Sequence, residues 1–593
     1  MKRLQRSLKR NPKKFWKHVN CQRKESGLPS NMSFQGINAS HPRDISQLFA
    51  TKFSSTFSSE SIPIEQVAIA ANSVPQVDIG FSRIVIEEQQ LLSSISKLKP
   101  STATGPDGIP AILLKKCSVE LLKPLHRIFN LSLESGVFPT VWKDAFMYPV
   151  HKKGDKRNVD NYRGISAINA VAKLFELVVL DPMFFHSKQY ISDTQHGFMP
   201  KRSTTSNLLV FTSYVIDALA AGYQVDAVYT DLTAAFDRIN HDIAIAKLRR
   251  LGFDGTFLQW LKSYLSNRKI SVTIEQYASD AFLVPSGIPQ GSHLGPLIFL
   301  LYFNDVNCML SGPRLSFADD LKMYLRIENT ADVTHLQSQL DMFARWCGLN
   351  GLAVNVSKCS VITFTRGKKP ILADYSIDSQ DIPRVDHIKD LGLILDPQLN
   401  YSLHTNYVVD KASRNLGFIF RMAKDFTDVY CLKSLYCALV RSTLEYASAV
   451  WCPFYQNSID RIEAIQRRFV RFALRRLPWQ NPWQLPSYES RCMLIDIDTL
   501  LTRRNVTRAL IVSDMLTARI DCSALLEQVN LIARTRASRN NILLYSTFHR
   551  TNYAANMGVS GLFRNFNRLT QAFDFNVSRN MLKIRFRNAC KNY

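Results

Sequence analysis

Two adjacent carboxylates, Asp319 and Asp320, stand inside an otherwise apolar stretch of the chain. Leu315 precedes them, and Leu321 and Met323 follow. Burying paired carboxylates costs much free energy unless a cation neutralises them. Because successive strand residues point to opposite faces, the two carboxylates converge on one ion only at a turn. The pattern predicts a β-hairpin with metal-binding acids at its tip, although solvated turn residues alone would also explain it.

A third acid, Asp231, ends the short apolar stretch 227–230, which is predicted to be a strand. If that strand end lies beside the hairpin, three carboxylates meet. Such a set suits hard divalent cations with oxygen ligands, above all Mg²⁺. Two such ions, about 4 Å apart, form the clamp for in-line phosphoryl transfer. One ion activates an attacking hydroxyl, and the other holds the triphosphate.

Between the predicted strand and the hairpin lies the segment 286–296, which contains three glycines and two prolines. This composition indicates an open loop, and glycine allows the backbone to approach a ligand closely. An ordinary surface loop has the same composition. Residues 297–303 are continuously apolar, which predicts a buried helix that Pro296 opens at its first turn.

The elements that position these residues belong to a large, basic and well-folded chain. It has 593 residues, a formal net charge of +25 and 46% hydrophobic residues. The charge suits a polyanionic partner, although a ribosomal or chromatin protein would share it. Eleven scattered cysteines without a CxxC pair argue against a zinc knuckle or a disulfide framework. Neither a membrane-length apolar run nor a secretory signal occurs, so we expect a nuclear or cytoplasmic protein with no membrane partner.

Three motifs follow one another along the chain: Asp231 with Phe236 comes first, then the Pro-Gln-Gly of 289–291, then the Phe-Ala-Asp-Asp of 317–320. Their order resembles that in the reverse transcriptases of non-LTR retrotransposons, and of jockey-like elements in particular. Further blocks agree in order, and so many colinear matches exclude chance. They are residues 105–110, 141–143, 151–155, 161–166, 195–198, 346–350, 355–358, 389–392 and 475–479.

The resemblance covers roughly residues 85–510 and implies an α+β right-hand polymerase. The expected domains are a basic N-terminal extension (1–84), fingers (85–215), a palm with an antiparallel sheet (216–395), a helical thumb (396–510) and a basic C-terminal region of unassigned role (511–593). The first 20 residues hold eight Lys or Arg, together with Phe15 and Trp16. This mixture fits single-strand binding, and it also fits a basic helix whose aromatics dock on the core.

The resemblance also implies roles for single residues. Asp231 and Asp319 would ligate both Mg²⁺ ions (with Mn²⁺ as a substitute), the Leu232 carbonyl would complete one site, and Asp320 would support them. The implied nucleotide-binding residues are Lys152 and Arg163 for the triphosphate, Phe236 against the 2′-hydroxyl, Gln290 and Gly291 at the templating pair, and Lys358 near the phosphates, where it could act as a general acid.

In the predicted thumb, residues 461–476 form a helix with an apolar stripe and a neighbouring basic stripe. The basic stripe consists of Arg461, Arg468, Arg471 and Arg475. It is predicted to follow the phosphates of a primer–template duplex, and a merely solvated basic face is the alternative.

Two departures qualify the resemblance. Gly164 stands where the family often has proline, which loosens that loop but leaves Arg163 in place. Only about 80 residues precede the predicted fingers, too few for the endonuclease that such elements typically encode. We therefore expect a polymerase without its own target-nicking domain.

The sequence thus predicts an RNA-directed DNA polymerase that extends a primer 3′-hydroxyl with dNTPs. Its expected partners are an RNA template and a DNA primer or target. Two alternatives remain open: a maturase-like protein of group II introns, which shares palm and fingers, and a catalytically inactive nucleic-acid-binding relic.

Overall fold

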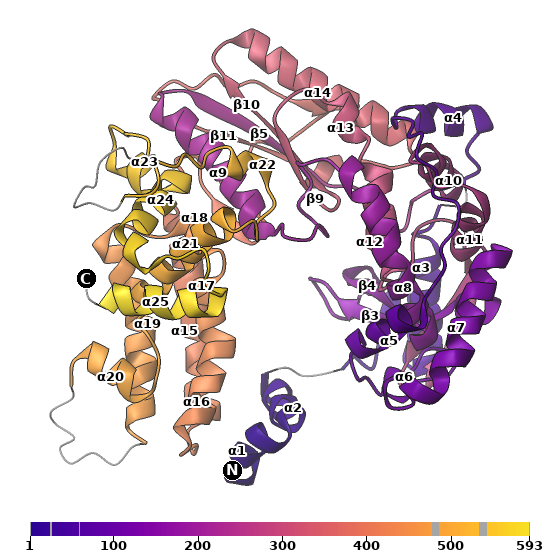
Figure 1. Cartoon of the computed structure of the whole chain (residues 1–593), viewed down its shortest axis with the longest axis horizontal. Helices are drawn as coiled ribbons and strands as arrows, with labels where there is room; N and C mark the ends of the chain where they lie inside the picture. The colour runs from indigo at the N-terminus through magenta and orange to yellow at the C-terminus, as the bar shows by residue number, and fades with distance from the viewer. Residues whose placement is uncertain (1, 24–26, 59, 477–485, 533–541, 592–593) are drawn as a thin grey trace.

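The computed structural model describes residues 2–23, 27–58, 60–476, 486–532 and 542–591. The chain is a mixture of helices and sheets, as predicted. A four-stranded sheet lies at the top of the view in Figure 1, with a body of helices and a second sheet to its right and an all-helical body to its left. Within the described residues, no helix combines the length and apolar character that a bilayer crossing requires.

The central sheet is antiparallel throughout and has the strand order β11-β5-β10-β9. Its strands are β5 (Gln224–Thr230), β9 (Arg314–Phe317), β10 (Asp320–Ile327) and β11 (Ser360–Phe364). The strand expected at 227–230 is therefore β5, which is flanked on both sides and buried along nearly its whole length. A strand in this position holds its carboxyl end rigidly.

Two helices cover opposite faces of this sheet (Figure 1). Val225 of β5 packs in the same apolar cluster as Leu208 of α9 (Thr204–Ala220). Val228, three positions on and therefore on the other face, packs in a second cluster with Leu340 of α14 (Thr330–Leu349). The sheet is thus sandwiched, and its end is where the predicted acids emerge.

The second sheet has the order β4-β3-β6-β7, and β8 also pairs with β6. Its strands are β3 (Asp144–His151), β4 (Tyr162–Ile168), β6 (Arg268–Ile274), β7 (Tyr277–Ala278) and β8 (Phe282–Val284). One face is covered by α3 (Pro42–Ser54), whose Phe49 is fully buried among sheet side chains. The small hairpin β1 (Met32–Phe34) and β2 (Ile37–Ala39) joins this cluster.

A further group of helices shares one large apolar cluster with the face of the central sheet that α14 covers. One of them is the predicted buried helix, α12 (Leu294–Phe303), which begins three residues earlier than expected. The others are α4 (Ile64–Asn72), α5 (Glu88–Lys97), α6 (Ala111–Lys116), α7 (Ser118–Ser135), α8 (Ala170–Ser187), α10 (His241–Arg250), α11 (Gly255–Leu265) and α13 (Val306–Met309).

Short strands connect the central sheet to the helical body: β12 (Ser376–Ile377), β13 (Gln380–Asp381), β14 (Ile388–Asp390) and β15 (Leu393–Leu395). The body itself contains α15 (Ser402–Met422), α16 (Val429–Tyr436), α17 (Ser442–Glu445), α18 (Ser448–Trp451), α19 (Gln456–Leu474), α20 (Tyr488–Leu494), α21 (Leu500–Leu516), α22 (Ser523–Leu526), α23 (Asn552–Asn556), α24 (Gly558–Arg568) and α25 (Arg579–Lys591).

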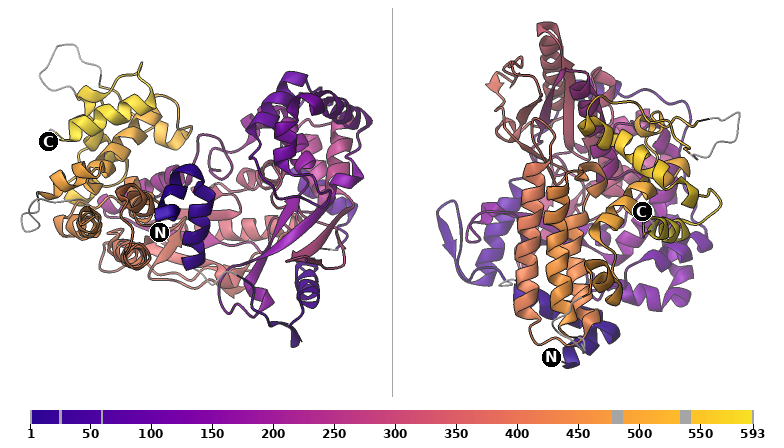
Figure 2. Two further views of the ribbon diagram at one scale, coloured as in Figure 1. Left: turned by 90° about the horizontal axis from the view of Figure 1, so that it is seen from below. Right: turned by 90° about the vertical axis from the view of Figure 1, so that its left-hand side faces the viewer.

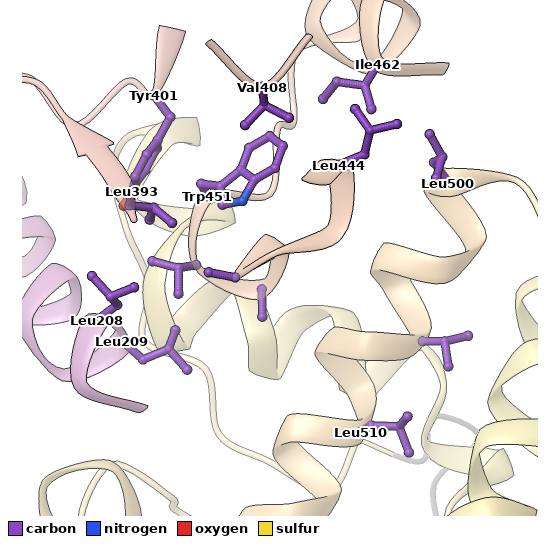
Figure 3. Close-up of a cluster of buried hydrophobic side chains, with 14 of the residues drawn as sticks. Leu208, Leu209, Leu393, Tyr401, Val408, Leu444, Trp451, Ile462, Leu500 and Leu510 are labelled. Carbon is purple, nitrogen blue, oxygen red and sulfur yellow. The ribbon is translucent and has the colours of Figure 1, made fainter. Parts of the chain in front are cut away.

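A buried tryptophan belongs to the apolar cluster that joins the helical body to the central sheet. Trp451 is fully buried, and its Nε1 donates to the Tyr446 carbonyl at 2.8 Å. In Figure 3, its ring lies among side chains from α9, α15 and α19, including Leu208, Val408 and Ile462. Because one cluster spans these elements, the helical body and the sheet share a continuous core.

The N-terminal residues are folded rather than extended. Helices α1 (Lys2–Arg10) and α2 (Pro12–Arg23) lie against the helical body near α16, at the lower end of Figure 1 and beside the N label in both views of Figure 2. Phe15 is fully buried and meets Phe426 at a ring distance of 6.4 Å. The sequence allowed either single-strand binding or a basic helix whose aromatics dock on the core. Phe15 docks on the core.

Candidate active site

The predicted hairpin is present, and it carries the acid pair at its tip. Strands β9 and β10 are joined by Ala318 and Asp319 alone, with Phe317 and Asp320 paired across the loop. Ala318 has a positive φ of 60°. A two-residue loop with positive φ at its first position normally holds glycine there, because a Cβ crowds the backbone.

Strand register brings the third acid to the same place. Thr230, the last residue of β5, pairs with Leu321 of β10. One further step along this antiparallel ladder puts Asp231 across from Asp320. The chain beyond β5 is held as well, because the Asn355 amide donates to the Asp231 carbonyl at 2.8 Å. Leu232 is buried there and forms an isolated bridge with Val354.

The three carboxylates are electrostatically coupled. Burial raises the pKa of Asp319, and the negative charge of Asp231 raises it further. Burial of its carboxyl, followed by the charges of Asp319 and Asp231, raises the pKa of Asp320 to about 6. Carboxylates that repel one another in a partly desolvated place are stabilised by any cation that joins them. Their oxygen donors are those that Mg²⁺ prefers.

The carboxylates do not, however, surround a common centre in this arrangement. Among the described residues, no group of three or more His, Cys, Asp or Glu side chains is placed to hold a metal ion. Instead, Asp231 Oδ2 accepts from Lys358 Nζ at 3.0 Å. The donor chemistry therefore fits a divalent cation, and an ammonium group now neutralises one of the donors.

A pocket of about 200 Å³ opens beside the acids. Its lining includes a buried ion pair, in which Lys322 Nζ donates to Asp390 Oδ2 at 2.6 Å. Tyr229 also donates to that oxygen, at 3.2 Å. Sequence reasoning found the block 389–392 but gave Asp390 no role, and it missed Lys322. The lining residues are Asn207, Tyr229, Thr230, Asp231, Leu315, Phe317, Asp320, Leu321, Lys322, Lys358, Ser360, Ile388, Lys389, Asp390 and Leu391.

The second sheet brings cations toward the same place. Lys152 follows β3, and its amide donates to the Asn161 carbonyl at 2.7 Å. Its side chain is exposed, and its positive charge lowers the pKa of Asp319, opposing the effect of burial. Arg163 is exposed on β4, where it pairs with Val150 in the ladder. Lys152 thus acts electrostatically on the acid hairpin, from a position just beyond β3 that is distant in sequence.

The structure also joins Phe236 to the loop of the Pro-Gln-Gly motif. Phe236 is half-buried and stacks on Phe299 of α12 with ring centroids 4.3 Å apart. Its carbonyl accepts from the Ile288 amide at 2.9 Å. Gln290 Nε2 donates to Asp237 Oδ1 at 2.6 Å, and burial raises the pKa of Asp237 to about 6. Sequence reasoning gave Asp237 no role.

Gly291 is placed where a larger residue would not fit. It has a φ of 98°, and an added Cβ would lie 2.8 Å from the Ser166 carbonyl oxygen of β4. The loop therefore approaches the second sheet closely at this point.

Comparison with known proteins assigns part of the chain to a family. Residues 150–412, which span the acid hairpin, β5 and the connection to the helical body, match the family model described as reverse transcriptase (RNA-dependent DNA polymerase). Residues 150–412 belong to the reverse transcriptase family. The resemblance predicted from the motifs is confirmed.

Relatives of this reverse transcriptase domain include polymerases from a transposon and from mobile elements of fruit flies. The chain is 26% identical over 412 residues to a probable RNA-directed DNA polymerase from transposon BS of Drosophila melanogaster, covering 67% of this chain and 45% of the relative. It is 26% identical over 422 residues to the RNA-directed DNA polymerase from mobile element jockey of the same species, covering 68% and 45%. The corresponding jockey protein of Drosophila funebris is 25% identical, covering 74% and 49%. The chain thus spans slightly less than half the length of these relatives.

The predicted basic stripe lies beyond the reverse transcriptase domain, on α19 and its C-cap residue Arg475. Of the four residues in the predicted apolar stripe, Ile462, Ile465 and Phe469 are buried, and Phe472 is partly buried against the same core. The side chains of the basic stripe are exposed and do not line the acid pocket in the described structure: Arg461, Arg468, Arg471 and Arg475. In the last of the motif blocks, residues 477–479 lie outside the described residues.

Proposed function

We propose that this chain is an RNA-directed DNA polymerase of a non-LTR retrotransposon, extending a primer 3′-hydroxyl along an RNA template. The observation that carries the proposal is the placement of Asp319 and Asp320 beside the end of β5, within a reverse transcriptase domain. The names of the BS and jockey relatives support the same activity.

In this proposal, the architecture is that of a right hand. The palm (216–395) holds the central sheet, the fingers (85–215) contribute β3 and β4 of the second sheet, and the thumb (396–510) is helical. The covering of the central sheet by α9 and α14 supports this division, since a sandwiched sheet gives its carboxylates fixed positions.

The chemistry assigned to the acids is in-line phosphoryl transfer. Two divalent cations, Mg²⁺ or Mn²⁺, would supply hydroxyl activation and charge neutralisation when bound. Asp231 and Asp319 would hold them, with the Leu232 carbonyl as a further ligand and Asp320 as a supporting acid. Asp231 must first release Lys358, whose Nζ lies 3.0 Å away.

The other residues of the site would orient the incoming dNTP. Exposed Lys152 and Arg163 present positive charge for the triphosphate. The half-buried ring of Phe236, fixed by its stack on Phe299, would exclude a 2′-hydroxyl. Gln290 and Gly291 would lie against the templating pair.

Lys358, once released from Asp231, would approach the leaving pyrophosphate as a general acid. The exposed arginines of α19 would hold the phosphates of the duplex. We place this activity in the nucleus or the cytoplasm, where RNA and DNA substrates occur.

The test is primer extension on poly(rA)/oligo(dT) with Mg²⁺ and dTTP, beside an Asp319→Asn variant. We expect extension by the wild type and a loss of roughly 100-fold or more in the variant, since metal-ligand interactions contribute several kcal/mol. RNA binding should be unchanged in both. Absence of extension by the wild type, with salt-sensitive RNA binding retained, would instead favour the inactive relic.

A further inference from the structure

The acid hairpin contains a backbone conformation that its own sequence does not favour. Ala318 adopts a φ of 60° at the first position of the two-residue loop. An L-residue with a Cβ is unfavourable in this left-handed region, and such conformations persist only where the surroundings impose them. Asp319 follows Ala318 directly in the chain, so the contacts that fix the Ala318 backbone also fix the position of the Asp319 carboxylate.

A single side chain holds both hydrogen-bonding groups of Ala318. The Ala318 amide donates to Gln195 Oε1 at 2.9 Å, and Gln195 Nε2 donates to the Ala318 carbonyl at 3.2 Å. The same Oε1 accepts from the Gly197 amide at 2.8 Å. Gln195 is only 3% exposed, so water does not compete for these bonds.

The segment that carries Gln195 is itself tied to β9. The Ser316 amide donates to the Thr194 carbonyl, and the His196 amide donates to the Ser316 carbonyl, both at 3.0 Å. Asn207 Nδ2 also donates to the Ser316 carbonyl, at 3.1 Å. The backbone that carries the Gln195 side chain is therefore held firmly against β9.

Close approach is possible because the next residue but one is glycine. A Cβ added at Gly197 would lie 2.3 Å from the Ala318 nitrogen. The sequence block 195–198 belongs to the retrotransposon resemblance but had no assigned role. These contacts give a role to two residues of the block. Gln195 holds the hairpin, and Gly197 leaves room for the hairpin backbone to approach.

We propose that Gln195 is a positioning residue for phosphoryl transfer. It clamps both polar groups of Ala318 and thereby holds Asp319 and Asp320 beside Asp231. The inference rests on the proposed polymerase function. Removing the clamp leaves the acids in the chain but frees the loop to relax toward ordinary φ values, which moves the carboxylates away from their working positions.

The first experiment compares two buried glutamines. Gln195→Met keeps the side-chain length and removes the hydrogen bonds. Gln339→Met is the matched control, because Gln339 is also 3% exposed and its Oε1 accepts the amides of Ser311 and Gly312, which precede the far end of β9. Both variants lose comparable bonds, but only one touches the loop with the acids.

Primer extension and thermal unfolding are measured on both variants in the full chain. We expect kcat to fall by about 10- to 100-fold in Gln195→Met, with the dTTP KM changed less than about threefold. In Gln339→Met, kcat should stay near wild type at a similar loss of Tm. Equal kcat losses that follow Tm in both variants would overturn the proposal, as would an unchanged kcat in Gln195→Met.

A rescue experiment separates positioning from general stability. Glycine adopts a positive φ without help, so the Ala318→Gly background should reduce the kcat effect of Gln195→Met to less than about threefold. An undiminished effect in that background overturns the proposal.

A wild-type protein that does not extend primers would end the proposed function but not this test. In that case, backbone hydrogen exchange decides: residues 318–320 should exchange faster in Gln195→Met than in Gln339→Met. Equal exchange in the two variants would refute the clamp.

Discussion

Lys358 Nζ lies 3.0 Å from Asp231 Oδ2, although 127 residues separate the two in the chain. The pair is accessible to solvent, with the lysine side chain 49% and the aspartate side chain 34% exposed. An accessible pair of this kind is weak and easily exchanged. The lysine thus neutralises the carboxylate here and can leave when a metal ion binds.

Removing this lysine should make the site easier for a cation to enter. In Lys358→Met, a divalent ion no longer competes with an ammonium group for Asp231. We expect Mn²⁺ to bind about two- to fivefold more tightly, as the small energy of exposed ion pairs allows. Mn²⁺ titration followed by electron paramagnetic resonance measures this without turnover. Exposed Lys153 provides the control as Lys153→Met, and weaker Mn²⁺ binding in Lys358→Met would contradict the prediction.

Replacing Phe236 by a smaller side chain should weaken the discrimination between dNTPs and ribonucleotides. We expect Phe236→Val to raise the use of ribonucleotides relative to dNTPs by about 10- to 100-fold, because a steric barrier to one oxygen is removed. The measurement is kcat/KM for rUTP and dTTP on the same primer–template. Phe198 is the matched control, since its exposed ring meets Phe236 edge-on at 6.1 Å. A Phe198→Val variant with the same gain would show that the effect is not specific.

The buried Asp237 should make stability depend on pH. Burial raises its pKa to about 6, well above the usual 3.8, so its ionised form disfavours the folded state. This penalty is fully present above pH 6 and disappears as the pH falls toward 3.8. Asp237→Asn keeps an acceptor for Gln290 and should raise Tm at about pH 8 but change it little at about pH 4. A Tm difference that is the same at both values would rule out the titration.

The arginines of α19 should contribute to binding through charge alone. Replacing the four exposed residues by glutamine should weaken RNA–DNA duplex binding and lower the salt slope by about 0.7–0.9 for each phosphate that is no longer neutralised. Arg467 lies on the same helix and pairs with Asp460 at 3.7 Å, so Arg467→Gln is the control. An unchanged salt slope of duplex binding in the quadruple variant would show that the duplex does not contact these arginines.

What could be predicted from sequence is the part encoded locally. The acid pair at 319–320 in an apolar setting predicts a hairpin, and the structure has one with the acids at its loop. The spacing of Ile462, Ile465 and Phe469 predicts the buried stripe of α19. In each case, a short run of residues contains the whole signal.

What could not be predicted depends on contacts between distant segments. Nothing near Lys358 indicates that it pairs with Asp231, and nothing near Gln195 indicates that it reaches Ala318. Likewise, Phe15 is an ordinary aromatic in a basic segment until the core around Phe426 is in place to receive it. Such pairings arise from the tertiary fold and not from local periodicity.

The docking of α1 and α2 has a mechanical consequence. Phe15 is anchored among the helices of the helical body, whereas Ser33 donates its amide to the Arg157 carbonyl beside the second sheet. The roughly nine residue steps from Arg23 to Met32 reach at most about 30 Å when fully stretched. This short covalent connection sets an upper limit on the distance between the helical body and the second sheet while both attachments hold.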